Sequence, residues 1–172
     1  MIKRYAFIIN PNAGSKKNRL IAQQLTEMLP PQCNAKIFLW NDAANFESIW
    51  NQLMQQPFDV VVAVGGDGSV NDVAKGLVGS KTALAIIPKG SGNGMARSLE
   101  IPLDVAQAIK VINGGNSIMM DLGYVNEYSF ISNAGVGFDT VVSQQFASSK
   151  KRGLMVYAWL TVKNLLSYRE LD

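Results

Sequence analysis

"VVAVGGDGSVNDVAKGL", residues 61–77, begins as a run of apolar residues and continues into three glycines that surround an aspartate. The pattern predicts a buried strand, a glycine-rich loop and then a helix. Glycines permit unusual backbone turns and let a phosphate approach main-chain N–H groups without a Cβ atom in the way. Ser69 stands where the helix N-cap is expected, and Asp72 follows three residues later as in a capping box. The stretch therefore predicts an anion site at a helix N-terminus.

Asp67 is the residue of this loop that needs a separate explanation. A carboxylate would repel a bound phosphate unless a cation lay between them, and Mg²⁺, bound directly or through water, is the natural candidate. Alternatively, Asp67 accepts a proton from an attacking hydroxyl group. A third interpretation is a tight turn that binds nothing.

The region around this stretch repeats a strand–loop–helix unit four times. We expect strands at 5–9, 36–40, 61–64 and 83–87, with helices at about 18–29, 43–55 and 103–113 around the helix of the opening stretch. Such alternation predicts a doubly wound, mostly parallel sheet of the α/β class. Three glycine-bearing loops, 10–15, 65–69 and 89–94, follow strands, so they should meet at the carboxyl edge, where ligands bind in these sheets.

The pattern changes after about Ser117. IMMDLGYVN and EYSFISNAGVGFDTVV predict antiparallel strands joined by a hairpin at Asn126-Glu127, and a helix is expected at about 153–168. We therefore predict a nucleotide-binding α/β domain at 1–117 and, at 118–172, the beginning of a β-rich domain that is too small to complete a core and is expected to be truncated.

The composition excludes several classes of site. The 172 residues include no histidine and one cysteine, Cys33, which excludes histidine-based triads, histidine metal sites and an internal disulfide. A net charge of +3 suits an anionic ligand or surface but does not indicate nucleic acid. No apolar stretch approaches a spanning helix or a signal peptide, so we expect a cytoplasmic protein.

Four motifs together resemble one known family. They are NPNAG at 10–14, GGDGS at 65–69, PKGSGNGMARSLEIP at 88–102 and DLGYVNEYSFISNAGVGFD at 121–139. GGDG[ST] after a strand is typical of the superfamily that contains diacylglycerol kinases, sphingosine kinases, NAD kinases and 6-phosphofructokinases. The other motifs resemble the diacylglycerol kinase catalytic domain, and no P-loop signature is present.

The resemblance implies a phosphofructokinase- or NAD kinase-like N-terminal domain followed by the start of an antiparallel β-rich domain. It implies an ATP-dependent lipid kinase with Mg²⁺, acting on diacylglycerol or a sphingoid base. Asp67 would serve the metal or the acceptor hydroxyl, Asp121 would lie near the metal, and Asp139 would face the lipid headgroup as a second catalytic residue. The implied nucleotide-binding residues are Asn10, Pro11, Gly14, Gly65, Gly66, Asp67, Gly68, Ser69, Asn71, Ser91 and Asn93.

Two other functions remain open at this point: an NAD kinase, and a nucleotide-binding module without catalysis. The expected partners are ATP and a lipid, with no nucleic acid, and a homodimer is compatible with the sequence. Peripheral membrane contact is expected through 146–160, where Lys150, Lys151 and Arg152 precede an apolar helix. The alternative is that this helix packs on the remainder of the β-rich domain.

Overall fold

The computed structural model describes residues 3–11, 13, 21–29, 33–132, 134–135, 137–149 and 154–165. The chain divides into two compact units, Met1–Ser132 and Asn133–Asp172. The first unit contains the α/β layers and a short hairpin, while the second contains two helices. The sequence pattern predicts a boundary near Ser117, between the nucleotide-binding domain and the β-rich domain. That division stays a prediction.

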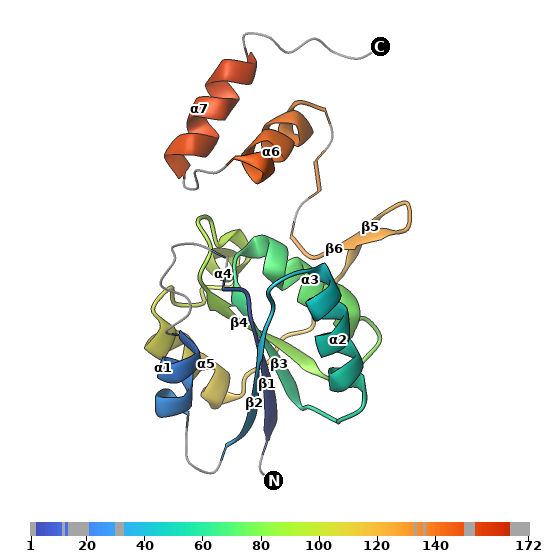
Figure 1. Cartoon of the computed structure of the whole chain (residues 1–172), viewed down its shortest axis with the longest axis vertical. Coiled ribbons are helices and arrows are strands. Elements are labelled where there is room, and N and C mark those ends of the chain that lie inside the picture. Colours follow the sequence, from blue (N-terminus) through green and yellow to red (C-terminus); the bar gives the residue numbers. More distant parts are fainter. Residues whose placement is uncertain are drawn as a thin grey trace. The chain divides into compact units, whose positions relative to one another are not determined.

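The first unit is built on a four-stranded parallel sheet in the order β2-β1-β3-β4 (Figure 1). Its strands are β1 (Arg4–Ile9), β2 (Asn34–Leu39), β3 (Val60–Gly65) and β4 (Ala83–Pro88). β1 pairs with β2 on one side and with β3 on the other, so that Ile9 lies between Leu39 and Val64. The predicted α/β class and parallel sheet are confirmed.

Helices cover both faces of this sheet, because successive side chains of a buried strand point to opposite sides. Ala6 and Ile8 pack with α2, α3 and α4, whereas Phe7 and Ile9 pack with α1 and α5. The helices are α1 (Ile21–Met28), α2 (Ala43–Met54), α3 (Asp67–Leu77), α4 (Gly94–Ser98) and α5 (Val105–Gly114). The five-residue α4 is a feature that the sequence patterns did not predict.

A hairpin follows the α/β layers and completes the first unit. β5 (Gly123–Val125) pairs antiparallel with β6 (Tyr128–Phe130), and Asn126 adopts a positive φ of 53° in the turn. A Cβ at Gly123 would lie 2.3 Å from the Phe130 ring, so a larger residue here would displace that ring. The predicted hairpin at Asn126-Glu127 is confirmed.

The second unit contains α6 (Phe138–Ser148) and α7 (Leu154–Leu165). The Phe146 and Tyr157 rings meet edge to face at 5.5 Å, and Gln145 and Asn164 exchange two side-chain hydrogen bonds of 2.9 Å. The prediction that FDTVV forms a strand was wrong. Val142 is buried and Phe146 follows it at helical spacing, so one stripe of the helix packs on α7. No helix among the described residues is long and apolar enough to cross a bilayer.

Substitution at Gly76 tests how α2 packs on α3. A Cβ at Gly76 would lie 2.1 Å from Cζ2 of Trp50. Because the indole would have to move, we expect Gly76→Ala to lower the free energy of unfolding by about 1–3 kcal/mol in urea titrations. Gly114→Ala is the matched control, since a Cβ there meets no atom within 4 Å and the residue ends a helix. Equal stability of the two variants would contradict this packing.

Candidate functional site

The carboxyl edge of the sheet brings the three predicted loops together. The strand order reverses between β1 and β3, and this switch point is where open α/β sheets bind ligands. Asn10 follows β1 and donates through Nδ2 to Ser69 Oγ at 3.0 Å. Lys89 follows β4 and donates its N–H to the carbonyl of Gly65 at 2.8 Å. The loops after β1, β3 and β4 therefore form one connected edge.

Two glycines at this edge are needed for close packing of backbone against backbone. A Cβ on Gly90 would lie 2.4 Å from the Cα of Gly66, and a Cβ on Gly66 would lie 3.0 Å from the Cα of Gly90. Gly65 is restricted in another way, because its Cβ would lie 2.6 Å from Ser69 Oγ. Gly66 has a φ of −94°, so space rather than backbone conformation excludes side chains there.

Gly68 differs from these neighbours, because a Cβ on it would meet no atom within 4 Å. It is exposed in the first turn of α3, on the edge that the three loops share. The packing of the protein therefore gives no reason for a glycine at this position, whereas close approach of a ligand to the backbone would give one.

The N-terminus of α3 lies at this edge, but the helix begins earlier than the sequence predicted. Gly66 is the N-cap, and the first intrahelical hydrogen bond runs from Val70 N–H to the Gly66 carbonyl at 3.0 Å. The prediction of Ser69 as N-cap was wrong, since Ser69 is buried within the first turn and accepts from Asn10. The N–H groups of Asp67, Gly68 and Ser69 have no acceptor within the helix and carry its positive dipole end.

Asp67 connects α3 to the loop after β4. Its Oδ1 accepts the N–H of Met95, in the first turn of α4, at 2.9 Å. This carboxylate therefore caps α4 from a position 28 residues earlier in the chain. The other carboxylate oxygen, Oδ2, lies beside the backbone of the next loop, where a Cβ on Gly92 would be 3.4 Å away from it.

Asn93 closes the loop that Asp67 contacts. Its Oδ1 accepts the N–H of Gly90 at 2.7 Å and its Nδ2 donates to the carbonyl of Gly90 at 3.0 Å. The residue is buried and has a left-handed φ of 52°. Asparagine tolerates this conformation better than most other non-glycine residues. Arg97 adds a bond from Nε to the Gly92 carbonyl at 3.0 Å.

The remaining predicted site residues lie in different places. Pro11 lies in the turn after β1, next to Asn10, and Ser91 is exposed in the loop after β4, while Gly14 lies outside the described residues. Asn71 accepts a hydrogen bond from Ile131 N–H at 3.3 Å. Asp121 is exposed in the segment before β5. Asp139 is exposed in the first turn of α6, in the second unit, and its role stays a prediction.

The donor set at the edge suits a Mg²⁺ ion that arrives with phosphates, rather than a cage made by the protein alone. The described residues contain no cluster of three or more acidic, cysteine or histidine side chains that could hold a metal. Mg²⁺ commonly takes one or two carboxylates and completes its octahedron with water and substrate phosphates. Asp67 supplies one carboxylate beside the open first turn of α3, which fits this mode.

The shifted ionisable groups lie at the other end of the sheet. Burial raises the pKa of the Tyr5 phenol, with smaller contributions from the nearby Cys33 and Asp59. Burial also raises the pKa of the Cys33 thiol. Tyr5 and Cys33 lie near the amino ends of β1 and β2, so neither group belongs to the carboxyl edge.

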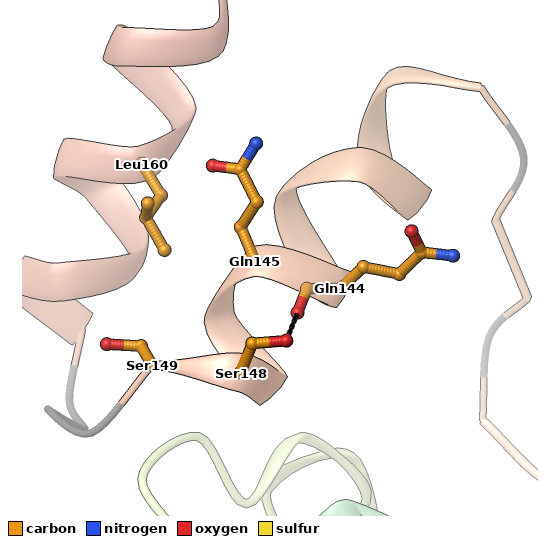
Figure 2. Close-up of a pocket in the computed structure, with 5 residues that line it drawn as sticks. All are labelled: Gln144, Gln145, Ser148, Ser149 and Leu160. Atoms are coloured by element: carbon orange, nitrogen blue, oxygen red, sulfur yellow. Dashed lines mark hydrogen bonds between the residues drawn. The ribbon is translucent and has the colours of Figure 1, made fainter.

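A hollow of about 430 Å³ between α6 and α7 is a separate feature (Figure 2). It is lined by Gln144, Gln145, Ser148, Ser149 and Leu160. Ser148 Oγ donates to the carbonyl of Gln144 at 2.9 Å, so this hydroxyl is used within the helix. The lining has no ionisable side chain and none of the predicted site residues, so the candidate site remains the carboxyl edge.

Comparison with known proteins decides the family. Residues 4–125 match the sequence profile described as the diacylglycerol kinase catalytic domain. The chain belongs to the diacylglycerol kinase catalytic domain family. The matched segment includes β1 to β4, all three edge loops and part of the hairpin.

Individual relatives of this diacylglycerol kinase-family chain agree with that result. It is 28% identical over 162 residues to a diacylglycerol kinase of Staphylococcus carnosus, covering 92% of this chain and 53% of the relative. It is 30% identical over 154 residues to that of Staphylococcus saprophyticus, covering 88% and 50%. A crystal structure of a diacylglycerol kinase from Bacillus anthracis matches with a TM-score of 0.62 and 25% identity, over 74% of this chain and 45% of that one. The chain thus spans about half the length of the relatives it matches.

Two contributors to the carboxyl edge were not predicted from the sequence. Gly90 was noted only as part of a glycine-rich turn, and its close approach to Gly66 needs the three-dimensional pairing of β3 with β4. The Met95 N–H was missed because main-chain groups leave no signal in a sequence. The PKGSGNGMARSLEIP motif contains Asn93, whose side chain closes this loop in the structure.

Two substitutions of Asn93 test its role in closing this loop. Asn93→Gly keeps the left-handed backbone but removes both bonds to Gly90. We expect this variant to lose about 1–2 kcal/mol in the free energy of unfolding. Asn93→Ala removes the same bonds and adds a side chain that disfavours the left-handed conformation, at a further cost of about 1–2 kcal/mol. Urea titration measures both. The loop assignment would be contradicted if alanine were tolerated as well as glycine.

Proposed function

We propose that this chain is the ATP-binding part of a kinase that transfers the γ-phosphoryl group of ATP to a lipid hydroxyl, that of diacylglycerol or a sphingoid base. The observation that carries the proposal is the convergence of Asn10, Asp67 and Asn93 with the N-terminus of α3 at the sheet's switch point. Its relatives are named diacylglycerol kinases, which supports the same reaction.

The edge suits the donor side of phosphoryl transfer. Such reactions depend mainly on positioning and on neutralising charge, rather than on covalent chemistry by the protein. The main-chain N–H groups in the first turn of α3 would bind phosphate oxygens, aided by the helix dipole. Asn10 and Asn93 hold the neighbouring loops in place through Ser69 and Gly90. These residues therefore supply a rigid, positively polarised cradle.

Asp67 has two separable tasks in this proposal. Its Oδ1 caps α4 through the Met95 N–H, which holds the two loops together. Its negative charge would bind the Mg²⁺ that accompanies ATP, or would accept the proton of the attacking hydroxyl. When bound, Mg²⁺ supplies charge neutralisation between the phosphates. A neutral amide can perform the first task but not the second.

Asp67→Asn and Asp67→Ala separate these tasks. Asparagine keeps an oxygen for the Met95 N–H, so we expect an unchanged melting temperature. Its transfer rate should fall more than about tenfold, equivalent to about 1.4 kcal/mol. Alanine should lose the rate and also lower stability by about 1 kcal/mol, because the cap is lost. The measurement is ATP-dependent phosphorylation by the protein in micelles of diacylglycerol or sphingosine.

The same assay contains its own controls. NAD replaces the lipid in a parallel reaction, and preferential phosphorylation of NAD would refute the lipid assignment. Binding of ATP without transfer to any of these acceptors would instead identify a non-catalytic nucleotide-binding module. If Asp67→Asn retains more than about a tenth of the wild-type rate, the charge of Asp67 is outside the chemistry.

Gly68→Ala tests whether the first turn of α3 binds phosphate. The new methyl group would meet no protein atom. Because alanine favours a helix by up to about 1 kcal/mol over glycine, stability should hold or rise. We expect titration calorimetry to show ATP-Mg affinity reduced by about tenfold or more, because the methyl group occupies space at the open turn. Gly66→Val is a poorer probe, since Gly66 also packs on Gly90. Unchanged affinity would remove this turn from the site.

A further inference from the structure

Asn71 occupies a position between the proposed donor edge and the hairpin. It lies four residues after Asp67 in α3. This spacing places the two residues on the same face of the helix, one turn or roughly 6 Å apart along its axis. The Asn71 Oδ1 accepts the N–H of Ile131, immediately after β6, at 3.3 Å. The side chain is therefore occupied by a contact to a segment 60 residues later in the chain.

This bond joins α3, which packs on the parallel sheet, to the segment that follows β6. β5 and β6 pair with each other, whereas β1 to β4 form the parallel sheet. A two-stranded hairpin is at best marginally stable alone, so contacts outside the pair must stabilise it. Ile131 supplies apolar contact, since it packs against the core cluster that includes residues of α3. Asn71 adds a directional contact between the hairpin and the helix.

We infer that Asn71 is a positioning residue whose side-chain oxygen fastens the β5–β6 hairpin to α3. The bond thereby sets the position, relative to Asp67, of the segment expected to begin the lipid-binding part. The lipid-side consequence rests on the proposed function, because residues 121–139 are expected to begin the lipid-binding part. Phosphoryl transfer requires the acceptor hydroxyl in line with the donor, and misplacement by about 1 Å can cost about 100-fold in rate. A hydrogen bond to the hairpin one helical turn from Asp67 would limit displacement of the segment that follows the hairpin.

Asn71→Leu removes the acceptor while keeping the same number and branching of side-chain heavy atoms. We expect hydrogen exchange at the Ile131 amide of the 172-residue chain to accelerate, because one protecting bond is lost. The expected acceleration is about five- to tenfold. In the phosphorylation assay, we expect the KM for the lipid to rise several-fold while the ATP-Mg dissociation constant changes by less than about twofold. This split separates the positioning role from the nucleotide-binding role that the family resemblance implies for Asn71, because loss of a nucleotide-binding residue would weaken ATP binding.

Two further variants serve as controls. Asn71→Asp keeps an oxygen for Ile131 and should preserve slow exchange; it is used for exchange alone, because its added charge lies one turn from Asp67. Asn45→Leu removes a comparable bond, in which Asn45 Oδ1 accepts the N–H of Asn41 at 3.0 Å, and should leave both the hairpin and the lipid KM unchanged.

Each outcome bears on the inference. Unchanged exchange at Ile131 in Asn71→Leu would overturn the tether, and a loss of ATP affinity equal to the rise in lipid KM would place Asn71 in the nucleotide site instead. If the wild-type protein neither binds ATP nor phosphorylates lipid, the proposed function fails, while the exchange measurement still decides whether Asn71 holds the hairpin.

Discussion

The approach of Gly66 to Gly90 is the constraint on which the candidate site depends. The two backbones are so close that a single Cβ on Gly90 would overlap the Cα of Gly66. This contact places the loop after β4 against the start of α3, and only then can Asp67 reach the Met95 N–H. Asn93 closes the same loop from within, through both polar groups of Gly90. The pairing of β3 with β4, which continues as far as Gly65 and Pro88, holds the two loops side by side.

This arrangement gives each of three polar residues of the edge a structural hydrogen bond, and Asp67 has a proposed ligand in addition. Asn10 bonds to Ser69, Asn93 to Gly90, and Asp67 to Met95. An edge built in this way keeps its geometry without a ligand, which would lower the entropic cost of the proposed nucleotide binding. It also means that a simple loss of activity after mutation is ambiguous here, because most substitutions change both geometry and chemistry.

Much of the fold could be predicted from the sequence because its signals are local. The apolar strands at 60–65 and 83–88 and the glycine-rich loops after them follow from residue type and spacing. The start of α3 was predicted too late because Ser69 looks like an N-cap, whereas its hydroxyl pairs with Asn10 across the sheet. The strand predicted through Val142 proved to be α6. A short apolar run fits both the helical and the strand period, and packing against α7 favours the helix here. The bonds from Asp67 and Asn71 could not be predicted, since both act on main-chain groups distant in sequence.

The topology of the sheet also determines when the edge can form during synthesis. β1 lies inside the sheet, yet one of its neighbours, β3, begins only at Val60, and the loop that meets Gly66 follows β4. Parallel pairings of this separation are slow to form, because a long chain segment must close first. A nascent chain that has emerged only as far as α3 therefore exposes the unpaired edge of β3 and an Asp67 whose partner has not yet been made. The edge becomes complete only after α4, which ends at Ser98, has left the ribosome.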